Sequence, residues 1–225
     1  MKTALVTGAA RGIGRAAADA LQEAGLRVLR LDIEGKGQDY IAYDLTNLAG
    51  IPKLIESLGE IHVLVNNAGM QNAVPIDEYT EERKTKILRV NLEAPVELIR
   101  AVSKQMIARR EGRIVSLASI ASWQPHPDLW YGITKAGVVS MTKSFASYLG
   151  RHGIQVNAVA PGPVDTDLLK VVDPKRVEGL MKVVYSARVG KPEEIAAAIT
   201  WLATAAPPII NGAILDINDG TYPRS

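Results

Sequence analysis

The sequence predicts an α/β fold, a single domain built on a doubly wound parallel sheet of about seven strands. Short β-rich runs alternate with longer helical patterns along all 225 residues, and this alternation is typical of parallel strands joined by crossover helices. Several of the β-rich runs are apolar on both faces, as strands are when helices cover both sides of a sheet. We find no internal repeat and no linker-like tract, so we expect residues 1–225 to form one domain.

The expected strands are the short β-rich runs, at residues 3–7, 27–32, 40–43, 63–66, 113–117, 155–160 and 214–217. The expected helices have longer patterns, at residues 13–24, 48–58, 80–109, 130–150, 166–182 and 192–204. Pro192 marks a helix start, because proline suits the first turn and the acids after it lie beside the positive end of the helix dipole. Only seven residues separate Asp32 from Tyr40, so we expect the usual crossover helix to be absent there or reduced to one turn.

Composition excludes several classes of function. The formal net charge is +2, which is too small to indicate a nucleic-acid or membrane-surface partner. The chain has no cysteine, so disulfides, thiolate zinc sites and cysteine nucleophiles are excluded, and we predict no metal site. No apolar run is long enough to cross a bilayer, and the first residues lack the layout of a signal peptide. We therefore expect a cytoplasmic protein.

A glycine-rich segment, TGAARGIG at residues 7–14, lies between the first expected strand and the first expected helix. Gly8 permits a tight turn, Gly12 lets the backbone approach a pyrophosphate, and Gly14 allows close packing of the helix on the strand. The free amides at the start of that helix, including that of Ile13, suit the phosphates of a dinucleotide. We therefore expect a Rossmann-type sheet with a nucleotide at this turn.

Asp32, the acid at the end of the second expected strand, indicates which dinucleotide binds. A carboxylate there accepts hydrogen bonds from the adenosine ribose hydroxyls and repels a 2′-phosphate. Arg11 would act in the opposite direction if it met such a phosphate, or it is a solvated loop residue. We favour NAD(H) over NADP(H), because Asp32 is placed to touch the ribose directly and Ile33 adds no positive charge.

Tyr131 and Lys135 have the spacing of an acid/base pair. Residues i and i+4 share one face of a helix, so the ammonium of Lys135 would lie beside the phenol of Tyr131. A phenol with a pKa of roughly 10 is a poor base at neutral pH, and a nearby cation lowers that pKa. Such a pair can move a proton at an alcohol or carbonyl oxygen. Without the nucleotide site beside it, the same pair would be read as an ordinary exposed one.

Together these residues resemble the short-chain dehydrogenase/reductase family, in its classical subgroup, over nearly the whole chain. The shared motifs occur in the family's order: TGAARGIG at 7–14, Asp44-Leu45, NNAG at 66–69, Asn91, GRIVSLAS at 112–119, YGITK at 131–135 and VNAVAPGPVDT at 156–166. The chain departs from the family pattern at the short connection after Asp32, at Ala118, where a second serine is frequent, and at Thr221, where a glycine is usual.

The resemblance implies hydride transfer between C4 of a nicotinamide and a carbonyl or secondary-alcohol carbon. It makes Tyr131 the general acid/base, gives Lys135 the tasks of lowering its pKa and holding the nicotinamide ribose, and places Ser119 on the substrate oxygen. Asn91 would hold a water in a proton relay, or it is an amide that satisfies backbone groups. The implied cofactor contacts also include Asp44, Leu45, Asn67, Ala68, Gly69, Pro161, Gly162, Val164 and Thr166.

The resemblance also locates the surroundings of the substrate. Residues 167–188 are expected to form a mobile lid. Its basic side chains are expected to solvate helix faces rather than to recognise charge on the substrate: Lys170, Lys175, Arg176 and Lys182. Met70, Gln71 and the loop before the catalytic tyrosine would border the pocket. In that loop, Trp123 or Trp130 is equally a substrate wall or plain loop packing. His126 is expected to be an exposed loop residue rather than a hydrogen-bond partner of the substrate.

The leading hypothesis is an NAD(H)-dependent oxidoreductase that interconverts a secondary alcohol and a ketone. The runner-up is a 3-oxoacyl-thioester reductase that uses NADP(H) and meets its acyl carrier through a basic face formed by Arg100, Lys104, Arg109, Arg110 and Arg113. A dehydrogenase of cyclic diols is a further candidate. A non-catalytic dinucleotide sensor typically lacks the tyrosine or the lysine, and a cofactor-free halide lyase of related fold lacks the glycine loop, so both rank lower.

We expect a small-molecule substrate and no nucleic-acid or membrane partner. The resemblance implies a homo-oligomer, a dimer or a tetramer, assembled through the helices expected near 80–109 and 130–150. The second of these carries more apolar residues than one buried stripe needs, which agrees with an oligomer.

Overall fold

The computed structural model describes residues 1–35, 37, 39–72, 74–170, 172 and 174–223. Its strands form one parallel sheet in the order β3-β2-β1-β4-β5-β6-β7. These are β1 (Thr3–Thr7), β2 (Arg27–Asp32), β3 (Tyr40–Ala42), β4 (Val63–Asn66), β5 (Gly112–Leu117), β6 (Ile154–Pro161) and β7 (Ile214–Ile217). The order reverses between β1 and β4, and ligands of open α/β sheets bind beyond the carboxyl ends of the strands at such a reversal. The predicted fold class is confirmed.

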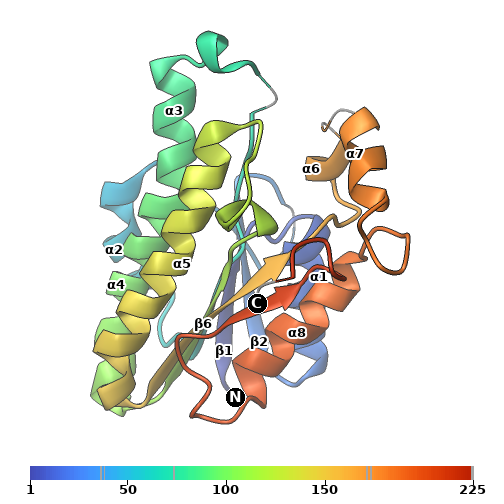
Figure 1. Cartoon of the computed structure of the whole chain (residues 1–225). Helices are drawn as coiled ribbons and strands as arrows, with labels where there is room; N and C mark the ends of the chain where they lie inside the picture. The colour runs from blue at the N-terminus through green and yellow to red at the C-terminus, as the bar shows by residue number, and fades with distance from the viewer. Residues whose placement is uncertain (36, 38, 73, 171, 173, 224–225) are drawn as a thin grey trace.

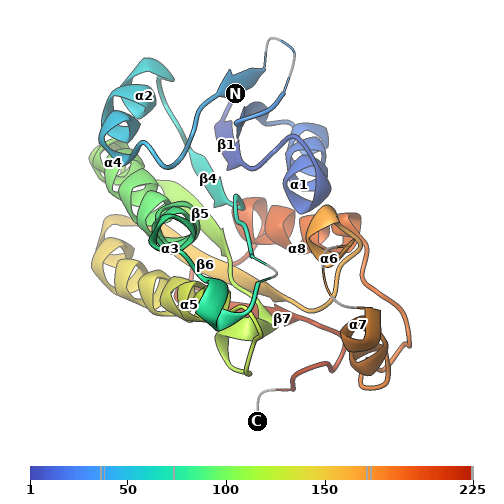
Figure 2. The ribbon, with the colours of Figure 1, turned by 90° about the horizontal axis from the view of Figure 1, so that it is seen from above.

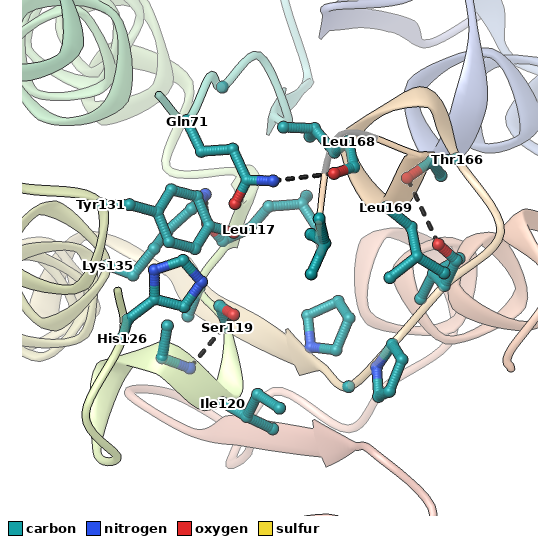
Figure 3. A pocket seen from close by; sticks show the side chains of 18 of the residues that line it. Gln71, Leu117, Ser119, Ile120, His126, Tyr131, Lys135, Thr166, Leu168 and Leu169 are labelled. Carbon is teal, nitrogen blue, oxygen red and sulfur yellow. Dashed lines mark hydrogen bonds between the residues drawn. The ribbon is translucent and has the colours of Figure 1, made fainter. Parts of the chain in front are cut away.

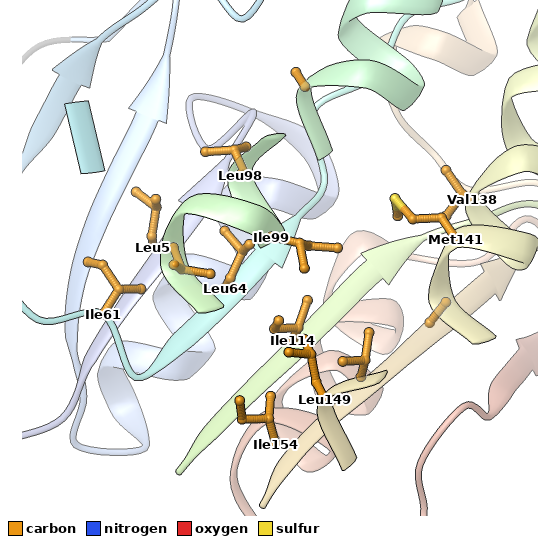
Figure 4. Close-up of a cluster of buried hydrophobic side chains, with 14 of the residues drawn as sticks. Leu5, Ile61, Leu64, Leu98, Ile99, Ile114, Val138, Met141, Leu149 and Ile154 are labelled. Atoms are coloured by element: carbon orange, nitrogen blue, oxygen red, sulfur yellow. The ribbon is translucent and has the colours of Figure 1, made fainter. Parts of the chain in front are cut away.

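Helices cover both faces of the sheet (Figures 1 and 2). One layer contains α2 (Ile51–Ser57), α4 (Ala94–Arg109) and α5 (Leu129–Leu149), and the other contains α1 (Gly12–Glu23) and α8 (Pro192–Thr204). Figure 4 shows the core under the first layer, where Leu5 of β1 lies among apolar side chains of α4 and β4. Its neighbours Ala4 and Val6 are equally buried in a second core, between the sheet and the layer of α1 and α8. The central strands are therefore apolar on both faces because each face is covered.

The helix expected at residues 80–109 is three segments in the structure. α3 (Glu81–Leu88) is capped by the hydroxyl of Thr80, a π-helical turn follows at Arg89–Glu93, and α4 then begins with a proline in its first turn. Pro95 has no N–H, so it cannot donate the α-helical hydrogen bond to the carbonyl of Asn91. A wider turn before the proline accommodates that loss.

The expectations for helices at 48–58 and 166–182 were also too simple. The first divides into a 3₁₀ turn at Leu48–Gly50 and α2, whose first turn contains a proline. The second divides into α6 (Asp167–Lys170) and α7 (Pro174–Met181). Proline lacks the N–H that would continue a helix and restricts the residue before it, so Pro174 starts a new helix.

The connection between β2 and β3 contains no helix among its described residues, 33–35, 37 and 39, as predicted. Gly35 has φ 147°, which disfavours any side chain. A Cβ at Gly35 would also lie 2.3 Å from the ring of Tyr40. Because Tyr40 begins β3, the glycine lets the chain turn back sharply into the next strand.

Within the described part of the chain, none of the helices is long and apolar enough to cross a bilayer.

Candidate active site

The turn between β1 and α1 is rich in glycine and lies at the carboxyl edge of the sheet. Gly8 and Gly12 have φ of 66° and 55°, in the left-handed region that favours glycine. A Cβ at Gly14 would lie 2.0 Å from the carbonyl oxygen of Gly8 and 2.3 Å from Nδ2 of Asn67. The first turn of α1 can therefore sit this close to β1 only without a side chain at Gly14.

The turn after β4 holds the glycine turn in place. Nδ2 of Asn67 donates hydrogen bonds to the carbonyl oxygens of Thr7, at 2.9 Å, and Gly8, at 3.1 Å. In return, the hydroxyl of Thr7 accepts from the amides of Asn67 and Ala68, both at 3.0 Å. These reciprocal contacts fix two strand ends that lie far apart in sequence.

Asp32 reaches the glycine turn from the end of β2. Its carboxylate accepts hydrogen bonds from the amides of Ala10, at 2.9 Å, and Glu34, at 3.2 Å. Arg11 is exposed, and its guanidinium lies 3.5 Å from carboxylate oxygens of both Glu34 and Asp167. The arginine is therefore flanked by acids.

The predicted adenine-side pair lies after β3. The carboxylate of Asp44 accepts from the amide of Thr46 at 2.8 Å, a hydrogen bond that lowers the pKa of Asp44. Leu45 is buried in the core under α2 and α4. Neither side chain lines the cleft described next.

Ser119, Tyr131 and Lys135 meet in one cleft beyond the carboxyl ends of the strands (Figure 3). Ser119 follows β5, and the other two lie on the first turns of α5, where Oδ1 of Asp128 caps the helix by accepting from the amide of Tyr131 at 3.1 Å. Nζ of Lys135 lies 5.6 Å from the centre of the Tyr131 ring and donates to the carbonyl oxygen of Leu117 at 2.7 Å. The predicted i, i+4 arrangement is present.

The electrostatics of this pair differ from expectation. Burial raises the pKa of Tyr131, the carboxylate of Asp128 acts in the same direction, and interaction with the Ser119 side chain acts against both. The expectation that Lys135 lowers this pKa is therefore wrong for the protein by itself, because loss of water is the larger effect on a buried phenol. Burial also lowers the pKa of Lys135 to about 8.

The lowered pKa of Lys135 makes stability depend on pH in a predictable direction. Between pH 8 and the ordinary lysine value of 10.5, the unfolded chain binds more protons than the folded one, so the free energy of unfolding rises with pH. Relative to a Lys135→Met variant, wild type should gain about 3 kcal/mol over this range. Urea unfolding at a series of pH values measures the gain. Lys143→Met, at an exposed site on α5, is the control, and parallel curves for wild type and Lys135→Met would contradict the prediction.

Asn91 lies in the π-helical turn and is buried. Its Oδ1 accepts from the amide of Met70 at 2.9 Å, and its Nδ2 donates to the carbonyl oxygen of Met70 at 2.8 Å and to Oγ1 of Thr134 at 3.1 Å. The amide therefore satisfies backbone groups of the turn after β4, the second of its two expected roles. The role of Asn91 in a proton relay stays a prediction.

The segment after β6 forms the opposite wall of the cleft. The amide of Gly162 donates to the carbonyl oxygen of Ile217 at 3.0 Å, and Oγ1 of Thr166 donates to the carbonyl oxygen of Val164 at 3.3 Å. The predicted site residues that line this one cleft are Ile13, Asn67, Gly69, Ser119, Tyr131, Lys135, Pro161, Gly162, Val164 and Thr166. Arg11 and Gly12 line a neighbouring depression that shares Thr166. The remaining predicted residues line neither: Gly8, Gly14, Asp32, Asp44, Leu45, Ala68 and Asn91.

The segment expected to form a lid, residues 167–188, also lines the cleft, through Leu168, Leu169, Val172, Arg176 and Leu180. Nε2 of Gln71 donates to the carbonyl oxygen of Leu168 at 2.7 Å, which ties the lid to the turn after β4 (Figure 3). The expectation that Arg176 only solvates a helix face is therefore wrong.

Two further expectations concern the loop before α5. The imidazole of His126 lines the cleft, 4.9 Å from the Tyr131 ring, so the expectation of an exposed histidine is wrong. Asp128, two residues later, was the feature of the sequence that could have indicated an ordered histidine. Its backbone amide donates to Nδ1 of His126 at 3.1 Å and fixes the ring. Neither tryptophan lines the cleft: Trp123 stacks on Tyr222, and Trp130 lies under the ammonium of Lys84.

Within the described ranges, no group of three or more histidine or carboxylate side chains is arranged to hold a metal ion.

Comparison with known proteins identifies close relatives over almost the full length. A family model described as enoyl-(acyl carrier protein) reductase matches residues 8–222. The 3-oxoacyl-[acyl-carrier-protein] reductase of Vibrio cholerae is 34% identical, over 98% of this chain and 97% of the relative. The structure of a 3-oxoacyl-[acyl-carrier protein] reductase with bound NAD from Brucella melitensis has a TM-score of 0.90 at 30% identity, covering 99% of this chain and 92% of that one. A gluconate 5-dehydrogenase from Burkholderia cenocepacia, in complex with NADP and tartrate, has a TM-score of 0.88 at 30% identity, covering 98% and 94%.

Proposed function

Because this chain belongs to the classical short-chain dehydrogenase/reductase family and is an oxidoreductase of CH–OH groups with a nicotinamide cofactor, we propose that it interconverts a secondary alcohol and a ketone with NAD(H). Tyr131 is the general acid/base of this reaction. The observation that carries the proposal is the cleft in which Tyr131, Ser119 and Lys135 lie together, next to the glycine turn.

The residues around the glycine turn fit a dinucleotide. A Cβ at Gly8 or Gly14 would meet backbone atoms at 2.8 Å or less, so glycine at these positions lets α1 begin close to β1 and β4. The free amides at this helix start would bind a pyrophosphate. Pro161, Gly162 and Val164 form the wall of the same cleft opposite Tyr131, where the nicotinamide would lie. When bound, the nicotinamide supplies or accepts the hydride.

The protein's own groups handle the proton and the oxygen. A raised pKa keeps the phenol of Tyr131 protonated at neutral pH, so it can donate its proton to the oxygen of a ketone. Oγ of Ser119 accepts from the amide of Ala121 at 3.2 Å. This contact orients Oγ beside Tyr131, where its O–H would stabilise the substrate oxygen on which negative charge develops. In the direction of alcohol oxidation the phenol must first lose its proton, so oxidation should accelerate as the pH rises.

Lys135 is held in position by the carbonyl oxygen of Leu117, at the end of β5. An ammonium has three N–H donors, so one contact with the strand leaves others for the hydroxyls of the nicotinamide ribose. This is the role that the family resemblance gives to Lys135.

The proposed NAD preference depends on the acids around the glycine turn. The carboxylate of Asp32 is fixed by the amide of Ala10, and Arg11 lies within 3.5 Å of carboxylate oxygens of Glu34 and Asp167. A 2′-phosphate would therefore meet negative charge on Asp32 and an arginine already flanked by acids.

An Asp32→Ser variant should shift the cofactor preference. We expect its kcat/KM for NADP⁺ to rise, and that for NAD⁺ to fall, by roughly tenfold each, which corresponds to about 1.4 kcal/mol. Steady-state rates with each cofactor measure the change. Asp39→Ser, in the same connection, is the control, and a wild type that prefers NADP⁺ would overturn the proposed preference.

The second candidate, a 3-oxoacyl-thioester reductase, is favoured by the Vibrio cholerae and Brucella melitensis relatives. The basic face expected to bind its carrier gives it less support. Arg100 pairs with Glu97, and Arg109, Arg110 and Arg113 donate to backbone carbonyl oxygens of their own chain. These guanidinium groups are already engaged in contacts that stabilise the fold.

A substrate panel distinguishes the two candidates. It contains acetoacetyl-CoA, acetoacetate and a series of aliphatic, cyclic and polyhydroxy secondary alcohols, each with NAD(H) and NADP(H). We expect turnover of free alcohols or ketones with NAD(H). Turnover restricted to the acyl thioester with NADPH would establish the second candidate instead.

The homo-oligomer remains a prediction, and α5 supports it less than expected. Val138, Val139, Met141 and Leu149 are buried within the chain itself, so most of the surplus apolar residues belong to its own core.

A further inference from the structure

Arg176 differs from the other basic residues of the lid. Nζ of Lys170 lies 2.9 Å from Asp167, and Nζ of Lys182 lies 3.3 Å from Glu178, both as exposed ion pairs on one helix or just beyond its end. Arg176, on α7, is partly buried and lines the cleft. No described carboxylate forms an ion pair with it. Among the described residues, Arg176 therefore lines the cleft without a carboxylate partner.

The cleft around Arg176 is positively charged. Its ionisable lining residues are His126, Tyr131, Lys135 and Arg176, and no described aspartate or glutamate lines it. Burial lowers the pKa of Arg176, yet a guanidinium remains charged at any physiological pH. A charge that has lost part of its water without gaining a partner costs free energy, and an anion bound in the cleft would recover that cost.

Asp128, the acid beside His126, cannot act as that partner. Asp128 is 4% exposed, and its carboxylate caps α5 at Tyr131, accepts from the amide of Asn72 and lies 3.2 Å from the hydroxyl of Tyr79. It also does not line the cleft. Its oxygens are thus committed to holding the loop and the start of α5.

His126 supplies a second group directed at the cleft. Arg176 is close enough to lower the pKa of His126, after the larger effect of burial. Nδ1 of the imidazole is engaged by the backbone of Asp128, and within the described residues Nε2 has no hydrogen-bond partner. The imidazole can therefore make one hydrogen bond to a group bound beside Arg176.

We propose that the substrate is a small hydroxy acid or oxo acid, whose carboxylate is bound by Arg176 with help from His126 while its carbinol or ketone carbon lies at Tyr131. This inference rests on the proposed function and specifies the substrate class of the same site. Arginine and carboxylate match as two parallel N–H···O hydrogen bonds. Leu168, Leu169 and Leu180 supply apolar walls beside this contact.

The geometry favours a carboxylate near the reacting carbon over the phosphate of a carrier-bound thioester. Arg176 lines the same cleft as Tyr131 and acts on His126, whose ring lies 4.9 Å from that of Tyr131, so an anion held by Arg176 and His126 would lie close to the reacting carbon. In a phosphopantetheine thioester, the long pantetheine arm separates the phosphate from the reacting 3-oxo group. That phosphate would lie outside this cleft.

The kinetic test uses a matched pair of ketones, acetoacetate and its uncharged methyl ester, with NADH. We expect wild type to prefer acetoacetate, and Arg176→Gln to lose roughly thirtyfold in kcat/KM for acetoacetate with little change for the ester, because hydrogen bonds to charged groups contribute about 2 kcal/mol. Lys182→Gln, which removes an exposed cation just beyond α7, should leave both rates unchanged. Equal losses on both ketones in Arg176→Gln, or a wild type that prefers the ester, would overturn the inference.

A binding test needs no turnover, so its failure can be distinguished from failure of the proposed function. L-tartrate is titrated calorimetrically into the complex of the protein with NADH. We expect wild type and Lys182→Gln to bind it alike, and Arg176→Gln to bind it roughly thirtyfold more weakly. Equal affinity in Arg176→Gln and wild type, or no binding by wild type, would reject the role of Arg176 whatever the reaction proves to be.

Discussion

A Tyr131→Phe variant should lose turnover by roughly 10² to 10⁴-fold, the range typical of removing a general acid/base, while it binds NADH as tightly as wild type. The substitution removes one hydroxyl group and keeps the ring. The helix cap survives, because Asp128 accepts from the backbone amide of residue 131. The ring contact with His126, at 4.9 Å between centres, also survives.

Steady-state rates and fluorescence titration with NADH measure the two halves of this prediction. Tyr148→Phe is the matched control, because Tyr148 lies on the same helix with 56% of its surface exposed and does not line the cleft. A Tyr131→Phe variant with turnover close to that of wild type would show that Tyr131 is not the general acid/base. Loss of NADH binding would instead assign the hydroxyl to the cofactor site.

The second large effect is expected at Gly14. An added Cβ would lie 2.0 Å from the carbonyl oxygen of Gly8, and a backbone atom within a hydrogen-bonded turn cannot move aside cheaply. Gly14→Ala must therefore push α1 away from β1 and break the contacts of Asn67 with Thr7 and Gly8. We expect a loss of stability of about 3 kcal/mol or more, at the upper end of overpacking, and loss of NADH binding.

Thermal unfolding with and without NADH tests this expectation. Gly179→Ala on α7 is the matched control, because a Cβ there would meet no atom within 4 Å. Alanine is also the better helix former, by about 1 kcal/mol, so this control should be neutral or slightly stabilising. A Gly14→Ala protein with the melting temperature and NADH affinity of wild type would show that the close packing of α1 is not required.

The sequence predicted the sheet well and the helix breaks poorly, for a physical reason. A strand covered on both faces needs a short, continuous apolar run, and few other structures produce that pattern; β1 and β4 were placed at their observed bounds. A long helical pattern persists across a proline, because the residues after the break still turn an apolar face to the same core. Pro95 and Pro174 were visible in the sequence, and treating each as a helix start would have corrected both assignments.

The site was predictable where its residues belong to strand ends and helix starts. The glycine turn, Ser119 and Tyr131 come together because parallel strands place their carboxyl ends at one edge. His126 and Arg176 lie on a loop and a lid, whose orientation depends on packing that local sequence does not encode. The expected direction of the Tyr131 pKa shift was wrong for a related reason. Sequence spacing predicts the neighbouring cation, whereas burial of the phenol depends on the whole fold.

The hydrogen bonds from Asn67 to the glycine turn have a consequence for biosynthesis. β1 pairs with β4 in the register of Ala4 with Val63, so the turn that follows β1 cannot be secured until the chain has been made beyond Asn67. Pairings between such distant segments form slowly, since the intervening loop must close first. On the ribosome, the nucleotide-binding turn therefore lacks its hydrogen bonds to Asn67 through the first stage of translation. Tyr131, which moves the proton, is synthesised only after these hydrogen bonds can form.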